Sequence, residues 1–255
     1  MERRNFLKVT GASIAAAGTG VGLSYCGKNV KYLGWVPNVQ ATTNYLRRNP
    51  RISFSNKAHS SVIGSGKGKV SLLWKTLERE TGEALVPHDQ KIGDCVGQAY
   101  ALATDILTTT RIFQMGYSEQ FIAKASVEAI YAGSRYEIGH IKHEYNGMLI
   151  GDGSFGRFAA EYLRDYGVLL RREYDNVDLR GYDPVRSRSW GETGVPDQLE
   201  PVAKKHPVRD VALVKSYEDV RDAMANGHPV VFCSGVGFEP SCNKCNPGGG
   251  RDTQG

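Results

Sequence analysis

Cys95 is the residue whose type and setting point most directly to chemistry. It follows Gln90-Lys91-Ile92-Gly93-Asp94, and from Val96 onward apolar residues recur at helical spacing. A thiol at the start of a helix lies near unpaired backbone N–H groups and the positive end of the helix dipole, which both favour the thiolate. We therefore predict a nucleophile at Cys95, against the plainer interpretation of a small apolar core residue.

The residues just before Cys95 could supply the other parts of an acyl-transfer site. Gly93 allows the backbone to turn sharply into the helix, and the Gln90 side chain can donate a hydrogen bond to an oxyanion. Asp94 would oppose formation of the thiolate unless it caps the helix and points away. The segment therefore predicts Cys95 and Gln90 as catalytic residues.

Three blocks of the sequence, in order between about residues 85 and 238, resemble the papain-like cysteine peptidases. They are Gln90…Gly93-Asp94-Cys95 at a helix start, Gly151-Asp152-Gly153-Ser154-Phe155 before a second helix, and Tyr217–Phe232 with its Asn226-Gly227-His228-Pro229-Val230 turn. Between the first two, Ser126-Val127-Glu128-Ala129-Ile130-Tyr131 is similar to a further helix start of that family. The resemblance implies hydrolysis of a peptide bond through a thioester on Cys95. It also implies a substrate cleft lined by Gly93, Asp94, Gly153 and Ser154.

The resemblance implies an α+β fold, in which a mostly helical lobe built on the Cys95 helix faces a β-rich lobe. We expect three parts: residues 1–26 as an export segment, residues 27–80 as an N-terminal extension or propeptide, and residues 81–255 as the papain-like domain. We expect the β-rich lobe to be incomplete, because only one of its strands is recognisable after residue 228.

The sequence departs from the family pattern at the glutamine and at the catalytic base. Gln90 lies one residue closer to the cysteine than is usual in the family. A cysteine nucleophile also needs a neighbouring imidazole, and none of the histidines stands where the family places it: His59, His88, His140, His143, His206 and His228. We expect the catalytic histidine beyond Gly255, so that residues 1–255 are inactive alone.

The N-terminus resembles a bacterial twin-arginine export signal. Arg3-Arg4 are followed by Phe-Leu-Lys and a weakly apolar run from Val9 to Leu23. The run is too short and too rich in glycine for a stable membrane span, and Tyr25 is too large to precede a lipid-anchored Cys26. We expect export to the periplasm or beyond, with the export machinery and a peptide or protein substrate as partners.

Other motifs carry less chemistry. The net charge of +5 is modest and sits largely in the N-terminal third, so we expect no nucleic-acid partner. His140 and His143 lack the further ligands that zinc needs, and Cys242-x-x-Cys245 indicates a loop disulfide or incidental cysteines. We expect no metal or cofactor. Gly64–Lys69 fails the spacing of a phosphate-binding loop, and we expect a flexible loop there.

Two other functions fit the same residues. Bacterial cell-wall amidases and endopeptidases also place an Asp-Cys pair at a helix start, but Ile138-Gly139-His140-Ile141 is a poor match to their histidine strand. An exported binding module could keep a papain-like cleft without turnover.

Overall fold

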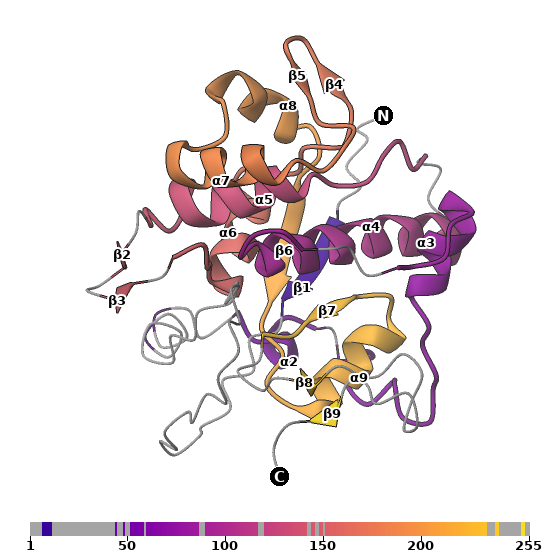
Figure 1. Ribbon diagram of the computed structural model, residues 1–255. Coiled ribbons are helices and arrows are strands. Elements are labelled where there is room, and N and C mark those ends of the chain that lie inside the picture. The colour runs from indigo at the N-terminus through magenta and orange to yellow at the C-terminus, as the bar shows by residue number, and fades with distance from the viewer. Residues whose placement is uncertain are drawn as a thin grey trace.

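The computed structural model describes residues 7–11, 44, 48, 52–58, 60–86, 90–116, 120–141, 144–145, 148–149, 151–233, 238–239 and 251–252. It is rich in helices and contains small sheets, as the α+β expectation requires (Figure 1). The helices are α2 (Phe54–Lys57), α3 (Trp74–Thr81), α4 (Cys95–Met115), α5 (Val127–Ala132), the π-helix η2 (Gly133–Glu137), α6 (Gly156–Asp165), α7 (Pro184–Thr193), the 3₁₀-helix η3 (Asp197–Leu199), α8 (Glu200–Ala203) and α9 (Tyr217–Ala225). The strands are β1 (Leu7–Gly11), β2 (Glu144–Tyr145), β3 (Met148–Leu149), β4 (Glu173–Tyr174), β5 (Val177–Asp178), β6 (Val208–Ala212), β7 (Val230–Val231), β8 (Phe238–Glu239) and β9 (Arg251–Asp252).

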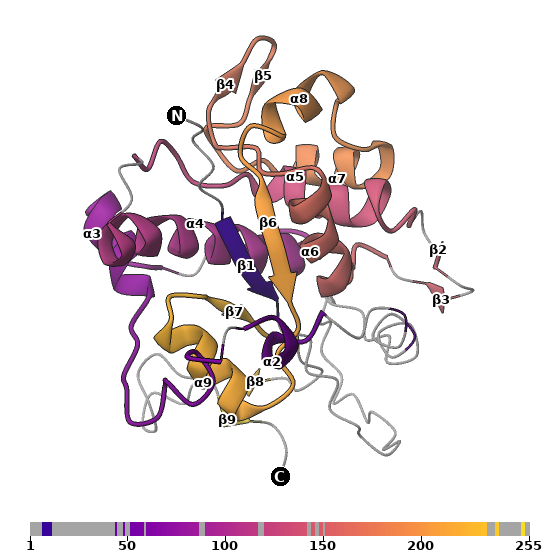
Figure 2. The same cartoon turned by 180° about the vertical axis from the view of Figure 1, so that it is seen from behind.

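Helix α4 is the central element of the domain. Its 21 residues place Val96, Tyr100, Ala103 and Leu107 in the core at helical spacing. It packs against α3, α5, α6 and the strands β1 and β7 (Figure 2). Within the described ranges, no helix is long and apolar enough to cross a bilayer.

A three-stranded parallel sheet lies beside α4. Its strand order is β6-β1-β7, so the N-terminal strand Leu7–Gly11 pairs with both of its neighbours. The sequence predicted a strand at β7 and did not predict β1, because Leu7–Gly11 belongs to the expected export segment. Arg3, Arg4 and Cys26, on which that expectation depends, lie outside the described residues.

A buried carboxylate holds the layer formed by α5 and α7. Glu128 is fully buried in α5, and its two oxygens accept from the Ser126 hydroxyl and from the Asp183 backbone N–H, both at 2.9 Å. Guanidinium nitrogens of Arg171 and Arg186 lie 3.9 and 3.8 Å from the same carboxylate. Because a buried charge is costly unless it is hydrogen-bonded and paired, these partners fix α5 against the start of α7.

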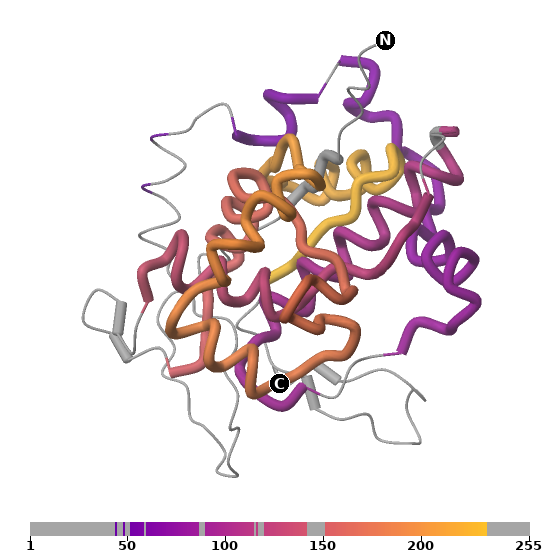
Figure 3. Tube along the Cα trace, turned by 90° about the horizontal axis from the view of Figure 1, so that it is seen from above, coloured from indigo at the N-terminus to yellow at the C-terminus, as the bar shows by residue number. Residues whose placement is uncertain are grey.

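The segment from Ile52 to Thr81 packs onto the domain. Ile52 accepts a hydrogen bond from Leu213 at 2.9 Å, and Phe54 donates to Leu213 at 2.7 Å, which extends the edge of β6. The Phe54 side chain is buried in a cluster with Val214 and Ala223. Seen from above, this part of the chain runs along the outside of the domain (Figure 3). The described part of the expected extension is therefore in close contact with the core, and whether it is a propeptide stays a prediction.

The loop around Gly64 is held in place rather than flexible. The backbone N–H groups of Gly64 and Gly66 donate to the Asp222 carboxylate of α9 at 2.5 and 3.0 Å, and Asn226 donates to Ser65 at 2.7 Å. A Cβ at position 66 would lie 2.7 Å from the carbonyl oxygen of Arg221, so only glycine allows this approach. The Gly64 loop lacks the spacing of a phosphate-binding loop, but its N–H groups bind a carboxylate of the same chain, that of Asp222.

Replacing Asp222 by alanine should free this loop. Burial raises the pKa of Asp222, but the N–H donors of Gly64 and Gly66 and the Arg221 guanidinium outweigh it and hold the pKa below its usual range. The contribution to stability is therefore complete above the ordinary aspartate pKa of about 4, and it is lost as pH falls through the lowered value. We expect the free energy of unfolding at pH 7 to fall by about 2 kcal/mol.

Urea unfolding measures this change, and tryptic cleavage after Lys67 and Lys69 measures release of the loop. Glu218→Gln, at an exposed position on the same helix, is the control and should change neither. Unchanged tryptic cleavage of Asp222→Ala would show that the carboxylate does not hold the loop.

Candidate active site

Cys95 is the first residue of α4, as the sequence predicted. Its thiol is partly exposed, and one side of the residue packs against the core cluster that contains Val96, Tyr100 and Cys233. The position therefore combines a helix start with access to solvent. A structural cysteine sealed in the interior would lack the second property.

The residues that approach Cys95 form a tight turn. The Gln90 amide Nε2 donates to the carbonyl oxygen of Ile92 at 2.6 Å, and the Asp94 N–H donates to the same oxygen at 2.9 Å. One N–H of the Gln90 amide is therefore used inside this turn, and only the second is left for a substrate. The oxyanion role of Gln90 stays a prediction.

Gly93 brings two of the predicted blocks into contact. A Cβ at this position would lie 2.8 Å from the Asp152 Cβ and 3.0 Å from the Asp152 carbonyl carbon. Because real side chains do not approach so closely, the turn before Cys95 can lie on the Asp152 backbone only with glycine at 93. The turn before Cys95 therefore lies directly against the segment that leads into Gly153.

Side chains of α5 and η2 hold the Gly153 loop through hydrogen bonds. The Tyr131 hydroxyl donates to the Asp152 carbonyl at 2.7 Å, and the Arg135 guanidinium donates to the Gly153 carbonyl. The hydroxyls of Ser134 and Ser154 share a hydrogen bond of 2.6 Å, and Ser154 is fully buried. A substrate contact in this loop would therefore use backbone atoms or move the loop, since the Ser154 side chain is already bonded.

The Asp94 side chain is directed into the protein and does not cap α4. It is fully buried and makes no side-chain capping bond to the helix. One carboxylate oxygen accepts from the Tyr182 hydroxyl at 2.6 Å and from the Ser187 hydroxyl at 3.4 Å. Burial raises the pKa of this carboxyl, and the hydrogen bonds from Tyr182 and Ser187 oppose that rise. In this arrangement Asp94 meets Cys95 as a buried charge and offers no side-chain atom to a substrate.

The thiol of Cys95 is less acidic than the helix start alone predicts. Burial, followed by the charge of Asp94, raises its pKa to about 11, while the N–H groups of Val96 and Cys95 lower it. Desolvation therefore outweighs the helix dipole, whose effect is confined to the first turn. The expectation that the helix start by itself would hold a thiolate is wrong for this site.

Cys233 is a second thiol in the same core cluster. Burial, followed by the charge of Cys95, raises the pKa of Cys233 to about 12. It follows β7, the strand that the sequence placed after the Asn226-Gly227 turn. A buried thiol of such low acidity is inert, so Cys95 is the more reactive of the two.

The described histidines lie in turns and segment ends. His140 is exposed in a left-handed conformation with φ of 47°. His206 lies in the turn before β6, and burial, with Arg172 and Lys205, lowers its pKa. His228 lies in the turn before β7. His59, His88 and His143 lie outside the described residues, as do Cys242 and Cys245.

Metal binding has no candidate in the described part of the chain. No group of three or more histidine, cysteine, aspartate or glutamate side chains comes together there.

Sequence reasoning missed the residues that support the site from other elements. Tyr182 and Ser187, which bind Asp94, lie about ninety positions further along the chain, and no local motif marks them. Tyr131 stood in a recognised block without a role. Its position four residues after Val127 was the available signal, because that spacing places both on one side of α5.

Comparisons with known proteins give one structural likeness. No family model matches the chain, and no curated protein matches it. A search of solved structures finds xylellain, a cysteine protease from Xylella fastidiosa, with a TM-score of 0.46 and 22% sequence identity. The likeness covers 77% of this chain and 63% of xylellain. The chain thus spans less than two thirds of that protein.

Replacing Asp94 by asparagine should make Cys95 more acidic. The amide keeps the shape of the carboxylate and can still accept from Tyr182, but it removes the negative charge that raises the pKa of the thiol. We expect the apparent pKa of Cys95 to fall below about 11 and to stay above the ordinary thiol value, because burial remains the larger cause.

Alkylation by iodoacetamide from about pH 7 to about pH 11, followed by mass analysis of the peptide that contains Cys95, measures this pKa. Asp165→Asn, on the far end of α6, is the matched control and should leave the profile unchanged. Identical profiles for Asp94→Asn and the unaltered chain would remove Asp94 from the account of Cys95.

Proposed function

We propose that this chain is the nucleophile-bearing part of a papain-like cysteine peptidase, with Cys95 as the nucleophile. The observation that carries the proposal is the joint position of Cys95 and the Gly153 loop. A partly exposed thiol begins a buried helix, and Gly93, two residues before it, lies against the backbone of Asp152. The ordered sequence blocks and the helix start at Cys95 support the same proposal.

The proposed reaction begins when the Cys95 thiolate attacks the carbonyl carbon of a peptide bond. A C–S bond forms, the carbonyl oxygen becomes an oxyanion, and the N–H groups at the start of α4 and the second N–H of Gln90 would donate hydrogen bonds to it. The C–N bond then breaks as the leaving amine takes a proton from an imidazolium. Water finally hydrolyses the thioester and restores the thiol.

The high pKa of Cys95 shows why this reaction needs a partner. At a pKa of about 11, about one molecule in ten thousand carries the thiolate at pH 7. A neighbouring imidazole that accepts the proton would form a thiolate–imidazolium pair, and its positive charge would oppose the effects of burial and of Asp94.

Peptide hydrolysis by a chain expressed with its reading frame continued past residue 255, compared with residues 1–255 alone, tests the proposal. We expect the longer chain to cleave peptides and to react at Cys95 with an epoxide inhibitor of cysteine peptidases. Cys95→Ala should reduce kcat/KM by about a thousandfold or more, as expected for loss of a nucleophile. Cys233→Ala is the matched control, because it removes a buried thiol from the same cluster and should keep most of the activity.

Other outcomes would point to the alternative functions. Turnover of muropeptides without turnover of ordinary peptides would indicate a cell-wall amidase or endopeptidase. A folded longer chain in which Cys95 does not react with the epoxide would indicate a binding module. Activity that survives Cys95→Ala would contradict the proposal directly.

We also propose that the chain is exported by the twin-arginine pathway, on the strength of the Arg3-Arg4 sequence and the weakly apolar run after it. Replacing both arginines by lysine should leave the precursor in the cytoplasm, because the export receptor reads the arginine pair. Fractionation of bacterial cells measures this. Since β1 pairs with β6 and β7, the measurement should include the melting temperature of the double variant, which should be unchanged. Equal export of both forms would contradict the proposal.

A further inference from the structure

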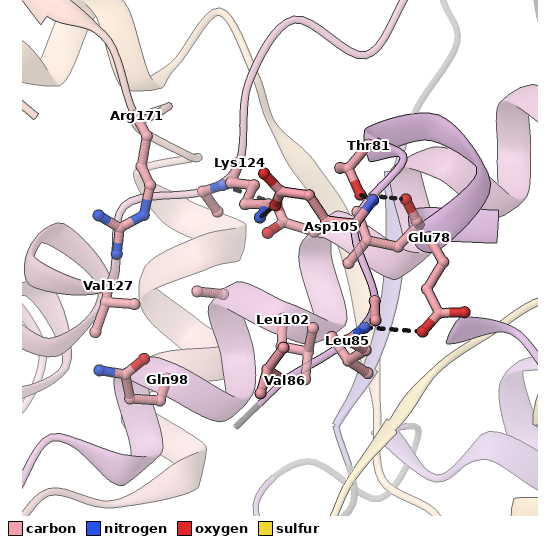
Figure 4. A pocket seen from close by; sticks show the side chains of 15 residues that line it. Glu78, Thr81, Leu85, Val86, Gln98, Leu102, Asp105, Lys124, Val127 and Arg171 are labelled. Atoms are coloured by element: carbon pink, nitrogen blue, oxygen red, sulfur yellow. Dashed lines mark hydrogen bonds and ion pairs between the residues drawn. The ribbon is translucent and has the colours of Figure 1, made fainter. Parts of the chain in front are cut away.

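A cavity lies beside α4, and its lining does not include Cys95. It has a volume of about 280 Å³, at the lower end of the range for small-molecule sites. Its walls come from α3, from residues 83–86, from the middle of α4, from residues 124–127 and from Arg171 (Figure 4). We call it the Asp105 pocket.

The Asp105 pocket has an apolar side and a polar side. Leu77, Leu102, Val86 and Val127 provide much of the apolar lining. Asp105, Lys124 and Arg171 provide charged and acidic groups; in Figure 4 Lys124 lies beside Asp105, and Arg171 lies apart from them, next to Val127. A ligand that fits both sides has a short apolar body and a single polar head.

Arg171 brings unused hydrogen-bonding capacity to the polar side. Its side chain is only 13% exposed, and its Nη2 lies 3.9 Å from the Glu128 carboxylate, beyond hydrogen-bonding distance. Both oxygens of Glu128 already accept from other donors, Ser126 and Asp183. The guanidinium makes no hydrogen bond to another described residue, so its N–H groups are available to a bidentate anion.

Asp105 is the second polar group, and it is held neutral. The side chain is 6% exposed, and one oxygen accepts from the Ala125 N–H at 2.7 Å. Burial raises the pKa of Asp105 to about 8, against smaller lowering effects of the Ala125 N–H, Arg171 and Lys124. At neutral pH its carboxyl group therefore carries a proton that it can donate.

The remaining charges around Asp105 are already paired. Lys124 forms an ion pair with Glu83 at 2.9 Å, and Glu78 accepts from the Leu85 N–H at 2.8 Å. The polar side thus presents one neutral acid and Arg171, whose charge faces Glu128 but whose N–H groups are not hydrogen-bonded to it. This combination favours a singly charged anion, since a dianion would meet Glu83, Glu78 and Glu128 with too little positive charge to balance it.

From this arrangement we infer that the Asp105 pocket binds a small apolar monocarboxylate, with the carboxylate between Arg171 and Asp105 and the apolar body against Leu102 and Val86. A short fatty acid and the C-terminal residue of a peptide share this chemistry. The inference is independent of the function proposed for Cys95.

Protein-observed NMR at about pH 6.5 tests the inference. It measures the binding of hexanoate and of N-acetyl-leucine to residues 1–255. Hexanol and hexylamine are the matched probes, because they keep the apolar body and change only the head. We expect both acids to bind and hexylamine not to bind, and hexanol to bind at least about tenfold more weakly than hexanoate. A preference between the two acids tells a fatty acid from a peptide end.

Two variants of the pocket test where the carboxylate of the ligand binds. Arg171→Gln should weaken hexanoate binding by about tenfold or more. Because Arg171 also lies near buried Glu128, Val86→Asp provides a second variant at an exposed position, where a new negative charge should weaken binding without disturbing the core. Arg180→Gln, at an exposed arginine outside the pocket, is the control and should bind normally.

The pH dependence separates this site from a general apolar cavity. Binding to the unaltered chain should weaken as pH rises through about 8, because Asp105 then loses its proton and repels the carboxylate. Asp105→Asn should keep binding and lose this dependence. Absence of binding by both acids, equal binding of hexanol or hexylamine, or full binding by Arg171→Gln would overturn the inference.

Discussion

The close contact between Gly93 and the backbone of Asp152 is the constraint on which the candidate site depends. It places the turn before Cys95 directly on the loop that contains Gly153. The loop is fixed from behind by Tyr131 and Arg135, which bind the carbonyl oxygens of Asp152 and Gly153. A side chain at position 93 would separate the two segments. The helix start at Cys95 would then no longer lie against the Asp152 backbone.

Competition between desolvation and the helix dipole decides the chemical state of the thiol. A helix start favours the thiolate by a modest amount, whereas partial burial beside a buried carboxylate opposes it more strongly. The structure therefore holds Cys95 as a thiol at neutral pH. A positive charge placed against the thiol would oppose the effects of burial and of Asp94 and would lower this pKa.

Buried carboxylates recur through the domain, and each meets a different set of donors. Glu128 accepts from a hydroxyl and a backbone N–H, and Asp222 accepts from the N–H groups of a glycine loop. Asp94 accepts from a phenol, while Asp105 has a single N–H and stays neutral at pH 7. The donors around Asp222 hold its pKa below the usual range, whereas burial outweighs the single donor to Asp105 and raises its pKa to about 8. Because of that difference, Asp222 holds the Gly64 loop through hydrogen bonds, and Asp105 is the candidate group for binding a ligand in the Asp105 pocket.

The sequence by itself determined the local elements of this protein. Helical spacing after Cys95 predicted α4, and the resemblance to the papain-like family implied a helix after the Gly153 loop and another before β7, where α6 and α9 lie. The choice of Cys95 as the nucleophile among the five cysteines stays a prediction. These features depend on neighbours within a few turns of the chain, which a pattern of apolar residues records.

Only the tertiary structure decided the partners and the charge states. The Asp94–Tyr182 pair joins residues 88 positions apart, and the Gly64–Asp222 pair joins residues 158 positions apart. The same distant contacts make the Gly64 loop an anchored one, insert β1 between β6 and β7, and bury the thiol enough to reverse the expected direction of its pKa. Periodicity describes which side of a helix is apolar, but burial and hydrogen bonding depend on what packs against that side, and this becomes defined only when distant segments meet.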